Sequence, residues 1–241
     1  MLLRQLLPTD ISQCLQLVQS VWSFGGFASP DAADSTALWY LHHHLQPSTH
    51  SFVLESDHHI AGYLTCTISG HPAFCESSSW QALGDTAEKA WHCATTDEER
   101  RQFLSTWFFG DTHVQRVLTQ ADIRAQDAVW VQLFIVSPQF QGQGLGRRLW
   151  QAFCDLRQKL ARERWVLLHT DTWCGWQFYE HRGMRRLASR PMLELDALPD
   201  GTQPAYFLYG QTPENRIGVR TLCPQPLPHH PPCGSAVGGY Q

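Results

Sequence analysis

The residues best suited to chemistry form a glycine-rich turn, Gln141–Gly146, with the sequence Gln-Gly-Gln-Gly-Leu-Gly. An apolar run at 131–136 precedes the turn and is typical of a buried strand, which Ser137-Pro138 ends. Apolar residues spaced three or four apart follow the turn and predict a helix over 145–160. Glycine lets the backbone turn tightly and direct several N–H groups to one point, where the helix dipole adds partial positive charge. The turn is therefore predicted to bind a phosphate group.

Two familiar phosphate-binding loops do not fit the spacing of this turn. It lacks the G-x-G-x-x-G pattern of dinucleotide-binding folds, and it lacks the G-K-[ST] end of a P-loop. Because glycine also serves ordinary strand-to-helix turns, the turn alone does not identify the phosphate. The neighbouring motifs have to indicate which ligand the phosphate group belongs to.

Several motifs, in the same order along the chain, resemble the GNAT superfamily of N-acetyltransferases. Gln141, Gly144 and Gly146 match the Q/R-x-x-G-x-G/A signature of that family. The preceding F-I-V-S-P, residues 134–138, matches its strand and its usual proline. Downstream, F-Y-E-H-R-G-M at 178–184 looks like its second motif, F-Y-E-x-x-G-F. The opening L-R-Q-L-L-P-T-D-I is similar to the first strand and helix cap of the family.

This resemblance covers roughly residues 1–69 and 128–210. It implies the α/β, GNAT-like acyl-CoA N-acyltransferase fold, a mixed central sheet flanked by helices. We expect one acetyltransferase domain over 1–210, with a helical insertion at 71–127 packed over the acceptor side. The Pro- and Gly-rich end, 211–241, cannot bury enough apolar surface to order itself, so it is predicted to be a flexible tail.

The resemblance also assigns residues to acetyl-CoA, the expected co-substrate. In this family the N–H groups of the glycine turn hold the pyrophosphate, and the pantetheine arm pairs with the preceding strand as an added strand would. A backbone N–H of that strand would stabilise the tetrahedral oxyanion by about 3 kcal/mol, as in other oxyanion holes. Arg147, in the first helical turn, is expected near a phosphate. The implied cofactor-binding residues are Phe134, Ile135, Val136, Gln141, Gly142, Gln143, Gly144, Leu145, Gly146 and Arg147.

Tyr179 matches the tyrosine that serves as general acid in this family. A departing thiolate with a pKa of about 8.5 benefits from a proton donor. A tyrosine packed against a core helix is the other interpretation, but the fixed spacing to Gly183 favours catalysis. Tyr179 is therefore the predicted catalytic residue.

No general base is evident. The amine has to lose a proton, directly or through water. Some members of the family use a glutamate on the central strand, but Trp130–Leu133 contains no carboxylate. Asp127, His71 and His113 are the nearest candidates, and each is more typical of a surface residue.

Two further groups of residues suggest other chemistry. Cys174 could act as a nucleophilic thiol in a ping-pong transfer, but a small packing residue is the favoured interpretation. The histidine runs at 42–44, 58–59 and 229–230 lack the spacing of metal ligands, because adjacent residues of a helix point in different directions. We expect no metal site.

The remaining elements alternate as in an α/β protein. The insertion shows one clear helix, marked by a Thr96–Glu99 capping box, and many aromatic residues. A helical subdomain with its own aromatic core is favoured over a substrate lid. Helices are predicted after Asp10, at 31–45 and at 173–181, and strands at 2–6, 51–55, 60–69, 165–170, 184–189 and 205–209.

Composition narrows the class of protein. The 241 residues are 43% hydrophobic with ten tryptophans, which is ample for a core. A net charge of −4 without a basic run argues against nucleic acid as a partner. The eight cysteines form no C-x-x-C pair, and neither a signal peptide nor a membrane-spanning run is evident. We expect a cytoplasmic protein.

Together these observations favour an acetyl-CoA-dependent N-acetyltransferase that acts by direct attack of a primary amine. A small-molecule amine is the favoured acceptor, since no protein- or nucleic-acid-binding module is recognisable. Acetylation of a protein N-terminus or lysine, transfer of a longer acyl group, and a non-catalytic CoA sensor remain alternatives. The sequence leaves open whether the chain is a monomer or a homodimer.

Overall fold

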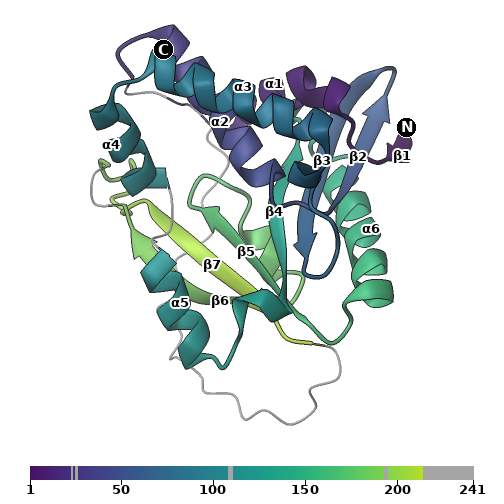
Figure 1. Ribbon diagram of the computed structural model, residues 1–241. Helices are drawn as coiled ribbons and strands as arrows, with labels where there is room; N and C mark the ends of the chain where they lie inside the picture. Colours follow the sequence, from purple (N-terminus) through teal and green to yellow (C-terminus); the bar gives the residue numbers. More distant parts are fainter. Residues whose placement is uncertain (23, 25–26, 108–110, 193–194, 214–241) are drawn as a thin grey trace.

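Seven strands of the described chain form one sheet in the computed structural model (Figure 1), which describes residues 1–22, 24, 27–107, 111–192 and 195–213. Their order is β1-β2-β3-β4-β5-β7-β6, and every neighbouring pair is antiparallel except β4 and β5. The predicted mixed sheet is thereby confirmed. The strands are β1 (Leu2–Arg4), β2 (His50–Ser56), β3 (His59–Ile68), β4 (Ala128–Val136), β5 (Trp165–Asp171), β6 (Arg185–Pro191) and β7 (Ala205–Gln211).

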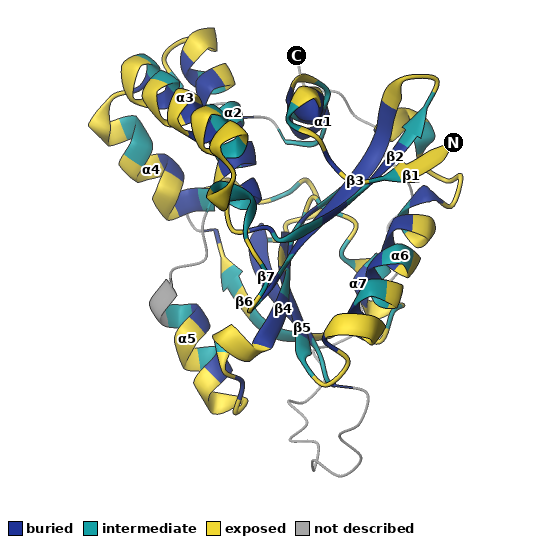
Figure 2. Ribbon diagram, turned by 45° about the vertical axis from the view of Figure 1, so that its right-hand side comes forward, coloured by how far each residue is buried: buried dark blue, intermediate teal, exposed yellow. Residues whose placement is uncertain are grey.

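Helices cover both faces of the sheet. Figure 2 shows α6 and α7 on one face and the other five labelled helices on the opposite face. Three of those five, α3 to α5, come between β3 and β4 in the chain. The helices are α1 (Ile11–Val21), α2 (Pro30–Leu45), α3 (Ser78–Ala94), α4 (Asp97–Trp107), α5 (Asp111–Gln120), α6 (Leu145–Leu160) and α7 (Gln177–Glu180).

The strand β3 lies at the centre of the core and is buried along almost its whole length. A strand covered by helices on both faces needs apolar residues on both, which explains its nearly continuous hydrophobic sequence. Leu64 packs in the cluster beneath α6, whereas Tyr63 packs in the cluster beneath α1 and α2. The sheet therefore separates two hydrophobic layers.

An irregularity in β4 opens the sheet. Thr65 of β3 pairs with Leu133, but the next residue, Cys66, pairs with Val131, so Gln132 is an extra, bulged residue. A bulge shifts the side-chain alternation by one, and accordingly Val131 packs beneath α6 while Leu133 packs on the opposite face. The pairing of β4 with β5 also ends at Val131. Beyond the bulge, β4 remains paired with β3 but is no longer paired with β5.

The predicted helical insertion contains three helices, of which the sequence showed one clearly. The helix α3 packs along α2, where the rings of Trp39 and Trp91 stack 4.0 Å apart. The predicted capping box does begin α4, because the Thr96 hydroxyl accepts from the Glu99 N–H and the Glu99 carboxylate accepts from the Thr96 N–H. The helix α5 packs elsewhere, with Leu118 in the cluster around Leu208 of β7. The aromatic core of this segment is shared with α2.

The end of the chain differs slightly from expectation. The strand β7 continues to Gln211, where the flexible tail was predicted to begin, since Gln211 still pairs with Val166. Residues 214–241 of that predicted tail lie outside the described residues. Within the described residues, no helix combines the length and the apolar character that crossing a membrane requires.

Candidate active site

A cavity of about 950 Å³ lies where β4 and β5 part. Both ends of the predicted site meet there, because Tyr179 and the glycine turn line the same space. Gln143 does not belong to the lining, and Arg182, which the sequence did not single out, does. The predicted residues that line the cavity are Phe134, Ile135, Val136, Gln141, Gly142, Gly144, Leu145, Gly146, Arg147 and Tyr179.

The glycine turn owes its shape to two left-handed residues. Gly142 and Gly144 have φ angles of 76° and 78°, which L side chains rarely adopt. A Cβ at either position would meet nothing within 4 Å, so the requirement is one of backbone conformation rather than of space. Gly146 differs, because its Cβ would lie 3.6 Å from the ring of Phe134, an ordinary contact that alanine could make.

This turn leaves the start of α6 with unpaired donors. Gly144 is the N-cap of α6 and has no side chain to accept from the first turn. The first bond of the helix is that of the Arg148 N–H to the Gly144 carbonyl, at 3.1 Å. The N–H groups of Leu145, Gly146 and Arg147 therefore remain available at the positive end of the helix, and all three residues line the cavity.

The second half of β4 offers a strand edge to the same cavity. The Ser137 N–H donates to the Ala61 carbonyl at 2.9 Å, which fixes the phase of the antiparallel ladder with β3. Backbone N–H and C=O groups point to alternate sides along such a ladder. Those of Ile135 therefore face β3, and those of Phe134 and Val136 face the open side. The Gln141 side chain reaches the Val136 carbonyl at 3.5 Å from that side. An extended ligand could pair with this edge.

Tyr179 lies beside the open edge, with its side chain 8% exposed. Its ring packs on Phe134 and Trp150, with centroids 6.4 and 5.8 Å away. No hydrogen bond to its hydroxyl occurs among the described residues. Burial raises the pKa of Tyr179, and the nearby Cys174 and Asp171 raise it further. The hydroxyl is therefore protonated at neutral pH and can donate.

The segment that positions Tyr179 is a turn followed by a short helix. The predicted helix at 173–181 is wrong in length, since α7 covers only Gln177–Glu180. The reason is Asp171, whose carboxylate holds the backbone of the following residues in a turn. Gly183, with a φ of 76°, ends the helix, and the Met184 N–H then donates to the Tyr179 carbonyl at 3.1 Å.

Side chains that the sequence did not predict line the other half of the cavity. They come from six separate elements or turns and follow no common motif. Asp171 ends β5, the strand beside β4, and this position at the carboxyl end of a strand was the one available signal. His44 belongs to a histidine run that suggested only metal binding. These residues are Trp22, Tyr40, His44, Trp107, His169, Asp171, Trp173 and Tyr206.

Asp171 is a buried carboxylate, 6% exposed. It accepts hydrogen bonds from the Trp22 indole at 3.3 Å and from the N–H groups of Trp173 and Cys174 at 2.9 and 3.0 Å. Burial raises its pKa, and these donors act in the opposite direction. Burial and then Asp171 raise the pKa of the Cys174 thiol to about 12. Cys174 is therefore a neutral thiol, which agrees with the favoured packing role and not with a nucleophile.

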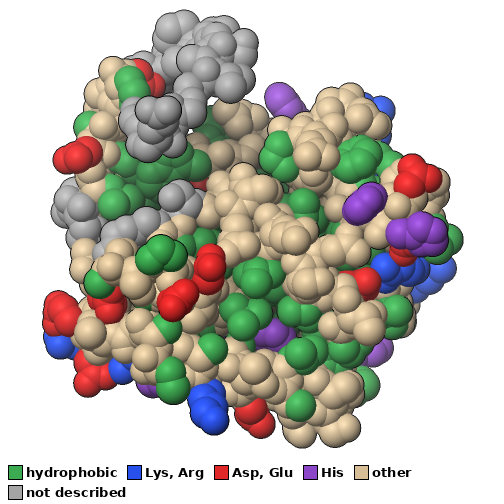
Figure 3. All heavy atoms as spheres, turned by 90° about the horizontal axis from the view of Figure 1, so that it is seen from above, with side chains coloured by type: hydrophobic (Ala, Val, Ile, Leu, Met, Phe, Trp, Pro, Cys, Tyr) green, Lys and Arg blue, Asp and Glu red, His purple; other side chains and the backbone are tan. Residues whose placement is uncertain are grey.

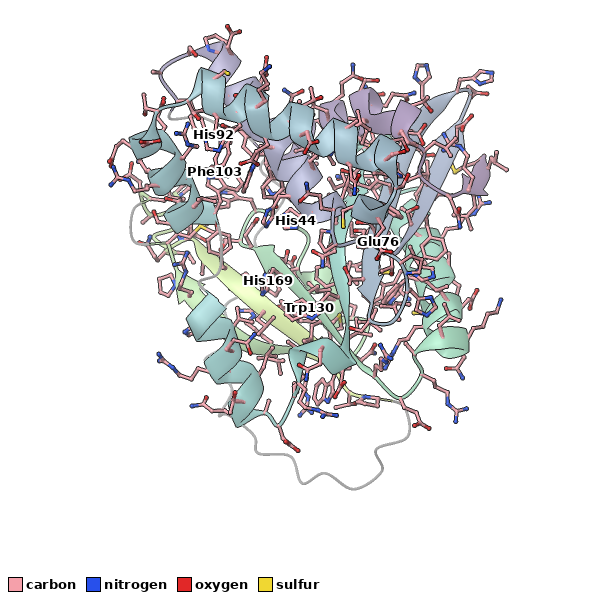
Figure 4. The ribbon with its side chains drawn as sticks, in the orientation of Figure 1. His44, Glu76, His92, Phe103, Trp130 and His169 are labelled. Atoms are coloured by element: carbon pink, nitrogen blue, oxygen red, sulfur yellow. The ribbon has the colours of Figure 1, made fainter. Side chains whose placement is uncertain are left out.

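Two imidazoles face the cavity, His44 from the end of α2 and His169 from β5 (Figure 4). Burial and then the neighbouring His43 lower the pKa of His44 to about 3, with a smaller contribution from His169 and against a hydrogen bond with Gln132. The bulged residue Gln132 also donates to the Thr67 hydroxyl at 3.0 Å. The pKa of His169, whose ring lies 5.5 Å from that of Trp130, is likewise lowered by desolvation. Both imidazoles are neutral at pH 7.

The three base candidates named from the sequence lie elsewhere, since none of them lines the cavity. Asp127 forms an exposed ion pair with Arg124. His71 packs on His50 with ring centroids 5.0 Å apart, and His113 belongs to α5. In the described part of the chain, no three His, Cys, Asp or Glu side chains are grouped closely enough to hold a metal ion.

One face of the surface is shown in Figure 3. On that face, Lys and Arg side chains are few and lie apart from one another, with acidic side chains and hydrophobic groups between them.

Comparison with protein families places these features in a known context. The model of the Acetyltransferase (GNAT) family matches residues 14–184, well over half of the chain. The chain belongs to the acetyltransferase (GNAT) family. It is accordingly an acetyl-CoA-dependent N-acetyltransferase with the mixed α/β fold of that family.

Solved structures with a similar fold have low sequence identity. One is smu.2055 from Streptococcus mutans UA159, 16% identical, with 89% of this chain and 100% of that chain covered and a TM-score of 0.49. The ribosomal-protein-S18-alanine N-acetyltransferase from Escherichia coli is 14% identical, with 90% and 99% covered and a TM-score of 0.48. The yncA protein from Salmonella typhimurium, solved with acetyl-CoA, is 13% identical, with 92% and 99% covered and a TM-score of 0.47. Comparison with curated protein sequences gives no match.

Proposed function

We propose that this acetyltransferase binds acetyl-CoA in the gap between β4 and β5 and transfers the acetyl group directly to the amine of a small molecule. One observation carries the proposal. The open edge of β4 leads from the bulge at Gln132 to the glycine turn, and the Tyr179 hydroxyl, without a partner among the described residues, lies beside that edge.

The cofactor would be held mainly by backbone groups. Its pyrophosphate would accept from the N–H groups of the turn and of the first turn of α6, where the helix dipole favours negative charge. Arg147 and Arg182 line the same end of the cavity and would attract its phosphates. The pantetheine arm would pair with Phe134 and Val136, because the polar groups of Ile135 are directed to β3.

The proposed reaction uses two donors, a β4 N–H and the Tyr179 hydroxyl, and two candidate proton acceptors, His44 and His169. The amine nitrogen attacks the thioester carbon, and a β4 N–H stabilises the oxyanion by about 3 kcal/mol. The C–S bond breaks as the Tyr179 hydroxyl gives its proton to sulfur. His44 and His169, both neutral, lie in the acceptor half and can take the proton that nitrogen loses, directly or through water.

The shape of the acceptor half favours a small molecule. Trp22 at the end of α1, Tyr40 of α2 and Trp107 of α4 line it, and Trp22 and Tyr40 lie in ring contact at 5.6 Å. An extended protein segment would need an open groove with backbone partners along its length. A cavity lined by aromatic side chains is more typical of a small-molecule site.

Calorimetric titration with acetyl-CoA and CoA, followed by a turnover assay across small amines and peptides with a free N-terminus, tests this proposal. We expect binding of both cofactors and acetylation of at least one small amine. Absence of affinity for either cofactor would contradict the whole proposal. Binding without any turnover would favour a CoA sensor, and turnover of peptides alone would favour a protein acetyltransferase.

A further inference from the structure

The acceptor half of the cavity has aromatic walls. The Tyr40 ring is central, with the centroid of Trp22 5.6 Å away and that of Trp107 6.1 Å away. Tyr206 of β7 and Trp173 of the turn after β5 complete the lining on the sheet side. Rings tilted toward one another in this way present both flat faces and edges to a ligand, and they favour apolar surface or an organic cation.

A single carboxylate interrupts this aromatic lining. Among the described lining residues, Asp171 is the one acidic side chain, and the described chain contains no Lys or Arg ion pair with it. Burial raises its pKa, and its donors, the Cys174 thiol, the backbone N–H groups and the Trp22 indole, favour the charged form without supplying a positive charge. A buried negative charge of this kind is costly until a cation joins it.

Charge is distributed unequally along the cavity. The arginines of the lining, Arg147 and Arg182, belong to the start of α6 and to the segment after α7, beside the glycine turn. Asp171 lies on the acceptor side, because its carboxylate accepts from the Trp22 indole at 3.3 Å, and it lines the same cavity as Tyr179. The cavity thus offers cations to phosphates at one end and an anion to the acceptor at the other.

We propose that Asp171, together with the rings of Trp22, Tyr40 and Trp107, forms an acceptor subsite for a monoamine carried on an aromatic or other apolar body. The assignment rests on the proposed function and names its substrate class. The ammonium group would pair with the carboxylate and lie against the rings, and the apolar body would fill the space that the aromatic rings line. A polyamine, an aminosugar or a peptide would bring further charges or hydroxyl and amide groups that these walls leave unpaired.

Direct binding tests the subsite without relying on turnover. The protein saturated with CoA is titrated with 2-phenylethylamine, spermidine, glucosamine and a tetrapeptide with a free N-terminus, and kcat/KM is measured for each with acetyl-CoA. We expect 2-phenylethylamine to bind, and to exceed the other three in kcat/KM by about 100-fold, since a buried unpaired polar group costs on the order of 3 kcal/mol.

The variant Asp171→Asn removes the charge and, with Oδ2, the acceptor of the Trp22 indole. Its side-chain oxygen can still accept from Trp173 and Cys174, so the turn that positions α7 is kept. We expect the dissociation constant of 2-phenylethylamine to rise at least tenfold while that of CoA stays within about twofold. Asp155→Asn, an exposed change on α6, is the matched control and should alter neither constant.

The outcomes distinguish failure of the acceptor subsite from failure of the proposed transferase function. Binding of 2-phenylethylamine that Asp171→Asn weakens, without turnover of any amine, would support the subsite and contradict the transferase function. Turnover of spermidine, glucosamine or the peptide without binding of 2-phenylethylamine would overturn the subsite and leave the function intact. Equal affinity of wild type and Asp171→Asn for 2-phenylethylamine would also overturn it.

Discussion

The two halves of the cavity are built from different parts of the chain. In the cofactor half, the groups that face the ligand are N–H and C=O groups of β4, of the glycine turn and of the first turn of α6. In the acceptor half they are side chains, contributed by the end of α1, by α2, α4, β5 and the turn after it, and by β7. A backbone surface tolerates side-chain changes but not changes of backbone angle, whereas a side-chain surface responds to single substitutions.

The halves meet at Tyr179, so its removal should produce the largest effect. Tyr179→Phe removes the proton donor to the departing sulfur, and we expect kcat to fall about 100- to 1000-fold with the affinity for acetyl-CoA unchanged. Steady-state kinetics with calorimetry measures both. Tyr63→Phe is a matched control, because Tyr63 is a fully buried tyrosine outside the cavity. An unchanged kcat and pH profile for Tyr179→Phe would remove the residue from the mechanism.

A change of backbone angle should disable the cofactor half. Gly144→Val places a β-branched residue at a φ of 78° and should displace the N–H groups of the turn. We expect the dissociation constant of acetyl-CoA to rise about 100-fold, or about 3 kcal/mol. Gly70→Val controls for strain, since Gly70 has a φ of 87° in a turn away from the cavity. Equal losses of affinity in both variants would contradict the special role of the glycine turn.

The helix that supplies His44 to the acceptor half should also make the fold sensitive to acid. Burial lowers the pKa of His42, on the same helix, to about 4 from 6.5. Between these values the unfolded chain takes up a proton that the folded chain does not, so stability falls as the pH falls from 6.5 to 4. His42 should contribute on the order of 3 kcal/mol to that loss.

Urea unfolding at pH 7 and pH 4.5 measures this contribution. In His42→Gln the difference between the two unfolding free energies should shrink by about 2 kcal/mol or more. The exposed His59 provides the control, His59→Gln, which should leave the difference as it is in the wild type. If His42→Gln lost as much unfolding free energy between pH 7 and pH 4.5 as the wild type does, His42 would titrate normally in the folded protein.

A conservative change on β4 should have the smallest effect of all. Ile135 lies in the cofactor half, but its side chain packs in the cluster beneath α1 and α2 and its polar groups face β3. We expect Ile135→Val to cost about 1 kcal/mol of stability and to change the affinity for acetyl-CoA less than about threefold. A much larger loss of affinity, measured by calorimetry, would mean that side chains of β4 hold the cofactor.

The contrast between a cofactor half built from backbone groups and an acceptor half built from side chains explains which parts of the site could be predicted. A turn that needs left-handed residues and a free helix start requires glycine at fixed spacing, so Gly142 and Gly144 are visible in the sequence. Asp171, Trp22 and Tyr40 approach one another only because β5, α1 and α2 pack around the gap, and no local spacing records that. The cofactor half was therefore predictable, and the acceptor half was not.

The fold shows a similar limit. Apolar periodicity predicted the strands and α6 because burial of one face or both imposes it. The bulge at Gln132 left no sequence signal, although it reverses the side-chain alternation of β4 and coincides with the opening of the cavity. The predicted helix at 173–181 was too long because the Asp171 carboxylate accepts from the N–H groups of Trp173 and Cys174 and forms a turn ahead of α7. Only its third hydrogen bond, from the Trp22 indole, depends on the tertiary fold.

Amide hydrogen exchange with and without CoA, resolved by residue, tests the backbone-held cofactor most directly. The N–H groups of Phe134 and Val136 face the gap, whereas that of Ile135 is paired with β3. We predict that CoA slows exchange at Phe134, Val136 and the first turn of α6 at least tenfold and leaves Ile135 unchanged. Binding of CoA with no change at Phe134 and Val136 would contradict the account.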